Sequence, residues 1–136
     1  MKVVLDTNVI ISGVLFPGGA PDRIVRAALT KRIDHATSPD LLTEVRRIFE
    51  KKFALPKKRV DELIRLLAES GELVYPTERI DVVKADPADN RVLECAFTAK
   101  TNYIITGDER HLLSLKSWKG IRLISPSDFV VAEDLL

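Results

Sequence analysis

The sequence contains a single cysteine, Cys95, so an intramolecular disulfide cannot form, and paired thiolate ligands for a structural zinc are missing. Neither His35 nor His111 has a partner at zinc-like spacing. Long apolar runs are absent too: those around Ser12 fall far short of the roughly 20 residues that a membrane span needs. Asp6 interrupts the N-terminal apolar run too early for a signal peptide. We expect a cytoplasmic protein with no membrane segment and no zinc site.

A strong charge of either sign is also lacking. The 136 residues carry 21 Lys plus Arg and 20 Asp plus Glu, for a formal net charge of +1. With 46% hydrophobic and 30% charged residues, the composition is that of a folded domain rather than a disordered chain. The length suits one compact domain with its own core, and no repeat or linker divides it. We therefore expect one domain over residues 1–136.

The apolar periodicity predicts alternating strands and helices. Strands are expected at residues 2–5, 34–37, 72–75, 103–106 and 121–124. Helices are expected at residues 20–31, 39–53, 56–70 and 87–100, with a helical turn near 110–115 and a last helix from 126. Residues 6–8 are predicted to form a turn. This alternation predicts a parallel sheet with helices on both faces, and ligand sites in such sheets lie outside the carboxyl ends of the strands.

Two of those strand ends carry an aspartate. Asp6 follows the strand at residues 2–5, and Asp108 follows the strand at residues 103–106. A carboxylate at the end of a buried strand is costly unless something pairs with it. Each of them could instead cap the helix that follows, an alternative that the sequence leaves open.

Asp89 stands in the first turn of the helix that begins at Asp86 and Pro87. At 100° per residue it falls on the same face as Val92 and Leu93, so we expect it to point inward at the rim of the core. The alternative is a capping arrangement in which Asp86 caps the helix and Asp89 reaches back toward it. Capping alone would not require Asp89 to face inward.

Glu44 lies just outside the apolar face of its own helix, a position that a solvated residue also occupies. Glu44 is a candidate site residue because it could lie near the other three acids. Four carboxylates near one sheet edge would repel one another unless a cation neutralised them. Oxygen ligands of this kind suit Mg²⁺ or Mn²⁺ rather than zinc.

Four sequence blocks together resemble the PIN-domain nucleases, and most of all their prokaryotic VapC-type toxin branch. The blocks are VLDTNVII at 4–11, Glu44, DPADNRVLECA at 86–96 and YIITGD at 103–108. The resemblance implies a three-layer α/β/α sandwich with a central parallel sheet. It also implies that Asp6, Glu44, Asp89 and Asp108 form a catalytic acid cluster that binds Mg²⁺ or Mn²⁺. Asp86 competes with Asp89 for the third place, but it is better used as the helix cap. Thr7, Asn8 and Thr106 match residues that support the acids in this family, although ordinary turn chemistry would also explain them.

The function that the resemblance implies is metal-dependent hydrolysis of RNA. Water activated by the carboxylate-bound ion would attack the phosphodiester and leave a 5′ phosphate and a 3′ hydroxyl. No side-chain nucleophile is needed, which agrees with the absence of a plausible Ser-His-Asp or Cys-His set. The family also commonly forms homodimers and binds an antitoxin peptide.

A basic stretch follows Glu44 and offers a surface for RNA phosphates. Residues 46–59 carry a net charge of +6, contributed by Arg46, Arg47, Lys51, Lys52, Lys57, Lys58 and Arg59 against one acid. A solvated helical hairpin would explain the same charges. Phe49 and Phe53 are spaced i, i+4 and are expected to be core or interface residues rather than platforms for bases.

Other functions compete with the nuclease. A haloacid-dehalogenase-type phosphatase would need a second aspartate two positions after Asp6, where this chain has Asn8. A catalytically silent PIN-like module that binds RNA or protein would not need to hold a metal ion. The plainest alternative is an α/β domain whose acids are ordinary caps.

Overall fold

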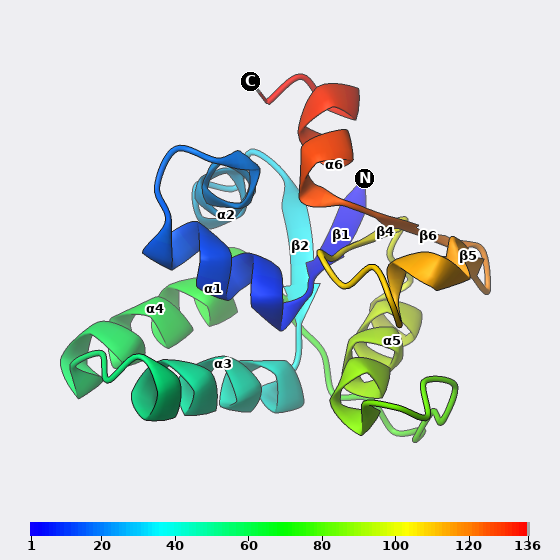
Figure 1. The fold of residues 1–136 in the computed structure, drawn as a ribbon, viewed down its shortest axis with the longest axis horizontal. Coiled ribbons are helices and arrows are strands. Elements are labelled where there is room, and N and C mark those ends of the chain that lie inside the picture. Colours follow the sequence, from blue (N-terminus) through cyan, green and yellow to red (C-terminus); the bar gives the residue numbers. More distant parts are fainter. Residues whose placement is uncertain (136) are drawn as a thin grey trace.

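The computed structural model describes residues 1–135, which form one six-stranded sheet with helices on both faces (Figure 1). The strands lie in the order β3-β2-β1-β4-β6-β5, so the first strand in the sequence is central. Their bounds are β1 Lys2–Leu5, β2 Asp34–Thr37, β3 Glu72–Leu73, β4 Tyr103–Ile105, β5 Ser117–Trp118 and β6 Ile121–Ile124. All neighbours pair in parallel except β5, which runs antiparallel to β6. The expected three-layer α/β/α architecture is confirmed, with this short edge strand as the exception.

The helices begin where the sequence places caps and prolines. Their bounds are α1 Thr7–Leu15, α2 Ala20–Leu29, α3 Pro39–Lys52, α4 Lys57–Ser70, α5 Pro87–Ala99, the 3₁₀ turn η1 Leu113–Leu115 and α6 Pro126–Ala132. Three helices have proline in the first position, and each is capped by the residue before it: Ser38, Asp86 or Ser125 accepts a backbone N–H of the first turn. In residues 1–135 no helix is long and apolar enough to cross a membrane.

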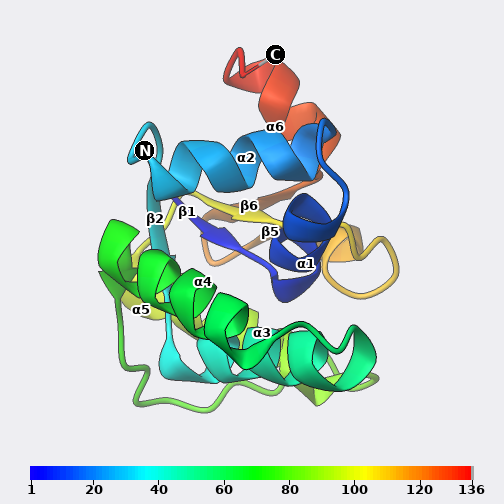
Figure 2. The same ribbon diagram turned by 90° about the vertical axis from the view of Figure 1, so that its left-hand side faces the viewer.

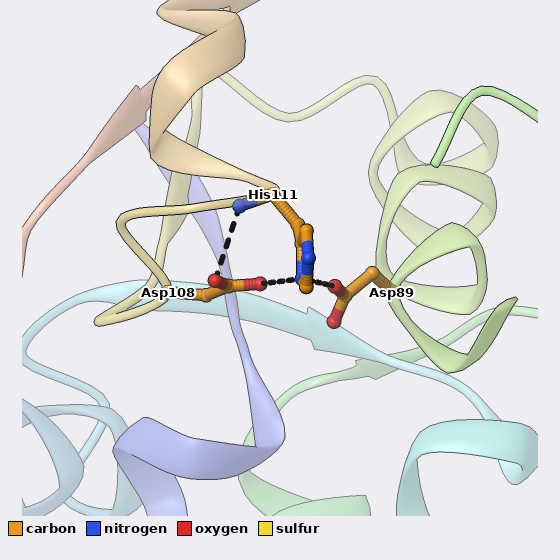
Figure 3. Close-up of side chains that lie close together, drawn as sticks. All are labelled: Asp89, Asp108 and His111. Atoms are coloured by element: carbon orange, nitrogen blue, oxygen red, sulfur yellow. Dashed lines mark hydrogen bonds and ion pairs between the residues drawn. The ribbon is translucent and has the colours of Figure 1, made fainter. Parts of the chain in front are cut away.

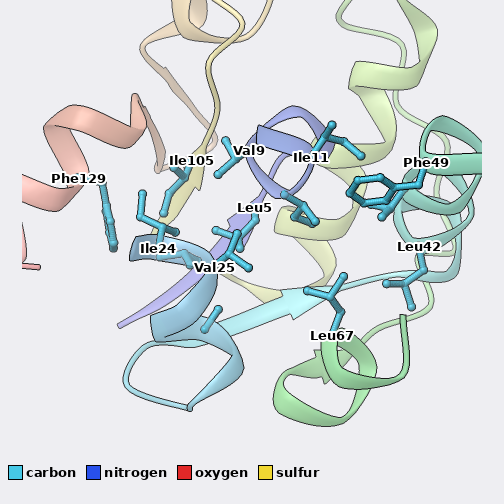
Figure 4. Close-up of a cluster of buried hydrophobic side chains, with 14 of the residues drawn as sticks. Leu5, Val9, Ile11, Ile24, Val25, Leu42, Phe49, Leu67, Ile105 and Phe129 are labelled. Carbon is cyan, nitrogen blue, oxygen red and sulfur yellow. The ribbon is translucent and has the colours of Figure 1, made fainter. Parts of the chain in front are cut away.

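Alternate residues of the central strands pack into two separate hydrophobic cores, one on each face of the sheet. Val3, Leu5 and Ile105 belong to a cluster that also includes apolar residues of α1, α2, α4 and α6 (Figure 4). Val4 and Ile104 face the opposite way, into a cluster formed mainly with α5. Because each strand is covered on both sides, its apolar residues run without polar alternation.

Helix α3 lies across the end of the sheet where the parallel strands finish, between α1 and α5 (Figures 1 and 2). Its N-terminal Leu41 packs into the α5-side core, whereas Leu42 and Val45 pack into the other core. Phe49 is fully buried, as its helical spacing predicts. This crossing brings the exposed flank of α3, with Glu44, over the carboxyl ends of the strands.

The structure corrects three expectations about local structure. Residues 6–8 are not a turn: α1 begins at Thr7 directly after Asp6, whose backbone carbonyl accepts from Val9 and Ile10. The predicted strand at 72–75 is limited to Glu72–Leu73. Strand β5 was not expected, and it joins β6 through the two-residue turn Lys119–Gly120, in which both φ angles are positive.

Two buried polar side chains of α5 fasten the long segment between β3 and α5. The Asn90 side-chain oxygen accepts from the backbone N–H groups of Val82 (3.0 Å) and Val83 (2.8 Å), and its amide donates to the Val83 carbonyl (2.8 Å). Glu94, which is 2% exposed, accepts from the Ile80 N–H (2.8 Å) and pairs with Arg91 (2.7 Å). These contacts satisfy backbone groups in a segment without regular structure.

Candidate functional site

Three carboxylates meet at the carboxyl edge of the sheet. Asp6 follows β1, Asp108 follows β4, and Asp89 lies in the first turn of α5. All three line one cleft of about 760 Å³, together with Glu44 and Asp86. Asp6 and Asp89 are 5% and 8% exposed, so the inward direction predicted for Asp89 is confirmed.

Thr106 ties the ends of β1 and β4 together. Its hydroxyl donates to Asp6 Oδ2 (2.6 Å) and accepts from the backbone N–H of Asp108 (3.0 Å). Nearby, the side-chain oxygen of Asn8 accepts from the Gly107 N–H (3.3 Å). Thr106 and Asn8 therefore fix the relative positions of two acids, whereas buried Thr7 lines the same cleft.

Asp89 and Asp108 converge on a residue that the sequence reasoning set aside. Nδ1 of His111 lies 3.5 Å from Asp89 Oδ2 and 3.4 Å from Asp108 Oδ2 (Figure 3). The other oxygen of Asp108 accepts from the backbone N–H groups of Arg110 and His111, both at 3.2 Å. Among residues 1–135, the group of potential metal ligands whose atoms all lie within 4.8 Å of one another is Asp89, Asp108 and His111. The ligand atoms of Asp6 and Glu44 lie outside this group.

The raised pKa values of two acids show that ionising them in this cluster costs free energy. Burial raises the pKa of Asp6 to about 6, despite the hydrogen bond from Thr106, and repulsion from Asp108 and Asp86 adds to the effect. Burial, proton sharing with Asp108 and repulsion from Asp6 also raise the pKa of Asp89. Burial alone would raise the pKa of Asp108, but the hydrogen bonds from Asp89 and from the His111 backbone outweigh it and lower that pKa.

Asp86 and Glu44 have other partners within the cleft. Asp86 caps α5 by accepting from the Ala88 N–H (3.1 Å), as expected, and its charge still reaches Asp6 and Asp89. Glu44 accepts two hydrogen bonds from its neighbour Arg47, at 2.7 and 3.0 Å. The structure therefore brings Glu44 to the cleft but pairs its carboxylate with an arginine.

The sequence pattern that defines the PIN domain matches residues 2–110, most of the chain and all of the acids described above. The chain belongs to the PIN-domain family. Proteins of this family are generally nucleases.

Two further proteins are similar to this PIN domain. An uncharacterized protein of Methanocaldococcus jannaschii is 31% identical over 120 residues, which cover 85% of this chain and 76% of that protein. Among solved structures, VapBC2 from Rickettsia felis, bound to a DNA fragment from its promoter, matches with a TM-score of 0.63 and 12% identity. That match covers 92% of this chain and 98% of the other, and it shows the fold.

The basic stretch of this PIN domain divides into two parts. Arg47 and Lys52 line the cleft, joined by Arg91 of α5. Arg46 instead pairs with Asp61 (2.7 Å) and Glu50 (3.6 Å), which ties α3 to α4. The other basic residues of the stretch are exposed outside the cleft lining: Lys51, Lys57, Lys58 and Arg59.

Sequence reasoning missed several residues of the cleft, among them Phe53, His111 and Arg91. Phe53 was expected to be a core or interface residue; it is 44% exposed, which excludes the core position, and it lines the cleft with Lys52. His111 could have been suspected from its position three residues after Asp108, in the turn that follows β4. Arg91 gave no distinct signal, because a charge in the first turns of a helix is usually solvated.

The acids of this PIN domain fit a divalent cation. Asp89 Oδ2 is buried and has no hydrogen-bond partner in the described structure, since His111 Nδ1 at 3.5 Å is too distant for a good bond. The raised pKa values of Asp6 and Asp89 show that the fold places negative charge here at a cost. A cation with oxygen ligands would remove that cost and give the unpartnered oxygen a ligand role.

Proposed function

We propose that this PIN domain is a cytoplasmic Mg²⁺- or Mn²⁺-dependent endoribonuclease that hydrolyses RNA phosphodiester bonds. We further propose that it is the toxin of a toxin–antitoxin pair. The observation that carries the proposal is the buried, unpartnered Asp89 Oδ2 in a cluster whose other acids, Asp6 and Asp108, follow adjacent strands. Membership of a nuclease family supports the reaction class.

Asp6, Asp89 and Asp108 would hold the ion, with Glu44 as the fourth acid of the cleft. When bound, the ion supplies positive charge that lowers the pKa of a water and stabilises charge on the phosphate. The rest is done by the chain. Thr106 keeps Asp6 at a fixed distance from the Asp108 backbone, so ligand geometry is set before substrate arrives.

Two other side chains have roles set by their partners. His111, beside Asp89 and Asp108, is placed to hold or move a proton at Nδ1. Arg47 is held by Glu44 at the cleft wall, and with Lys52 it would position the phosphates next to the scissile bond. For Glu44 to take a ligand role, Arg47 would have to leave its carboxylate and move to the substrate.

The toxin role and its partners are supported by the fold. The chain is similar in structure to a chain of VapBC2 from Rickettsia felis, which is bound to a DNA fragment from its promoter. We propose an antitoxin protein as the partner of this chain and a homodimer as its own assembly. Co-expression with the product of a neighbouring gene tests the first, and size-exclusion chromatography with light scattering tests the second.

The test of the reaction is cleavage of a mixed RNA pool with Mg²⁺, Mn²⁺ or EDTA. Asp6→Asn, purified in parallel, removes one acid, and Asp128→Asn serves as a matched control at an exposed position outside the cleft. We expect cutting by the wild type and Asp128→Asn with metal, and none in EDTA or by Asp6→Asn. Equal cutting by all three proteins would identify a contaminant and remove the support for a ribonuclease.

The alternative function, a silent PIN-like module that binds RNA or protein, is separated by metal titration. A nuclease must bind Mn²⁺ at the acid cluster, and Asp6→Asn should weaken that binding. Wild-type protein that binds RNA but neither binds Mn²⁺ nor cuts would support the binding module instead.

A further inference from the structure

A second cleft, of about 460 Å³, lies at the other end of α5. Its lining comes from the C-terminal half of α5 and the residues just after it, from residues 77–80 and from the β5–β6 hairpin. None of the acidic residues that line the first cleft belongs to it. Phe97 is eight residues beyond Asp89, which corresponds to about 12 Å along the helix. The two clefts are therefore distinct but share one helix.

An aromatic platform stands beside this second cleft. Phe97, a lining residue, is 40% exposed although the helix positions before it are buried. The ring of Trp118 packs edge-on against it, with centroids 6.1 Å apart, and holds it in place. An exposed ring with one fixed edge offers a flat face on which a planar group can stack.

A cation accompanies the platform. Lys119 Nζ lies 5.1 Å from the centre of the Phe97 ring and 5.6 Å from that of Trp118. Lys119 occupies the first position of the hairpin turn with φ of 50°, where asparagine or glycine is usual. The ammonium group of Lys119 therefore lies over both rings, although positive φ is unfavourable for a lysine.

The floor of the cleft carries polar groups. Thr101 is 5% exposed, and its hydroxyl has no hydrogen-bond partner in the described structure. Thr98 and Lys100 line the cleft, as do the carboxylates of Glu78 and Glu94, of which Glu94 is paired with Arg79 and Arg91. A buried hydroxyl without a partner is uncommon and marks a place where a ligand group could complete the bonding.

We propose that this second cleft binds one nucleotide of single-stranded RNA at a distance from the site of cleavage. The base stacks on Phe97, and Lys119 leaves the rings to pair with the adjoining phosphate. Stacking on an aromatic side chain beside a cation is how proteins hold single strands without reading their sequence. The choice of RNA as the nucleic acid rests on the proposed function, but the binding chemistry does not.

The chain contains its own reporter for this cleft, because Trp118 is its one tryptophan. Asp6→Asn protein, which should not cut, is titrated with a short oligoadenylate in EDTA while tryptophan fluorescence is followed. We expect a saturable change in emission. In the same background, Phe97→Ala should weaken apparent binding by about tenfold or more, the loss expected when a base–aromatic stack is removed. Lys119→Gln should weaken it as well, because it removes the charge that pairs with the phosphate.

Matched controls exist for both substitutions. Phe16→Ala removes a more exposed phenylalanine (67%) that lines neither cleft. Lys31→Gln changes another lysine with positive φ, at 62°, also outside both clefts. Both controls should bind as tightly as the parent. Thermal unfolding of every variant shows whether the fold is intact, and Lys119→Gln, at an exposed turn, keeps the test valid if Phe97→Ala unfolds.

Three results would overturn the inference: no emission change with RNA, a change that both substitutions leave intact, or a change that follows protein concentration alone. The last would identify the cleft as a contact between copies of the chain. Failure here is separate from failure of the proposed function. If the wild-type protein cuts RNA but Trp118 emission does not respond, the nuclease proposal stands and the second site is refuted. If Trp118 emission responds to RNA but no cleavage occurs, the second site stands and the nuclease proposal is refuted.

Discussion

Removing the charge of Asp6 should stabilise the protein in metal-free buffer, and by an amount that depends on pH. The folded chain raises the pKa of Asp6 from its ordinary 3.8 to about 6. Between these values the folded state binds more protons than the unfolded state, so wild-type stability falls as pH rises from about 4 to above 6. Asparagine does not titrate, and it can still accept the hydrogen bond from Thr106.

The size of the effect follows from the pKa difference. At about 1.4 kcal/mol per pKa unit, the shift corresponds to about 3 kcal/mol of stability lost by the wild type on the alkaline side. Asp6 is buried, so solvent screening reduces this figure little. For a chain of this length it amounts to a melting-temperature difference of about 10 °C. Relief of the repulsion on Asp89 acts in the same direction.

The assay is thermal unfolding of wild type, Asp6→Asn and the control Asp128→Asn in EDTA, from pH 4 to 8. The advantage of Asp6→Asn over the wild type should be smallest near pH 4 and largest above pH 6.5, whereas Asp128→Asn should follow the wild type throughout. Adding Mn²⁺ at pH 7.5 should stabilise the wild type and not Asp6→Asn. A difference between Asp6→Asn and wild type that stays constant with pH would refute the reasoning that Asp6 is ionised at a cost.

Two further predictions concern α5. Asp89→Asn should abolish metal-dependent cleavage, whereas Asp86→Asn should keep it because asparagine also caps helices; an active Asp89→Asn beside a dead Asp86→Asn would show that the third acid is Asp86. Asn90→Ala should lower the free energy of unfolding by about 2–3 kcal/mol in urea denaturation, because it leaves backbone groups of Val82 and Val83 without partners. An Asn90→Ala protein as stable as wild type would mean that water replaces the lost contacts.

Much of the fold could be predicted from the sequence because its signals are local. Serine or aspartate followed by proline marks the starts of α3, α5 and α6, and uninterrupted apolar runs mark β1 and β4. The inward direction of Asp89 followed from helical periodicity alone. The start of α1 was missed because Asp-Thr-Asn after a strand is equally typical of a turn, and two-residue β5 is too short to show a period.

The parts of the site that were missed depend on contacts between elements. Arg46 and Arg47 point to different sides of α3, so Arg46 pairs with Asp61 on the next helix while Arg47 lines the cleft. His111 joins Asp89 only because the turn after β4 folds back over the start of α5. Phe53 is exposed because α3 ends beside it, at a residue whose spacing matches buried Phe49.

The hydroxyl bridge from Thr106 to Asp6 also constrains when the site can exist. The two residues are 100 positions apart, and β1 lies in the sheet between β2 and β4. During synthesis, β4 and the acid that follows it emerge about 100 residues after β1 and Asp6. Contacts of such long range form late and slowly. A growing chain therefore carries Asp6 without Thr106 and Asp108 until β4 has emerged and paired with β1.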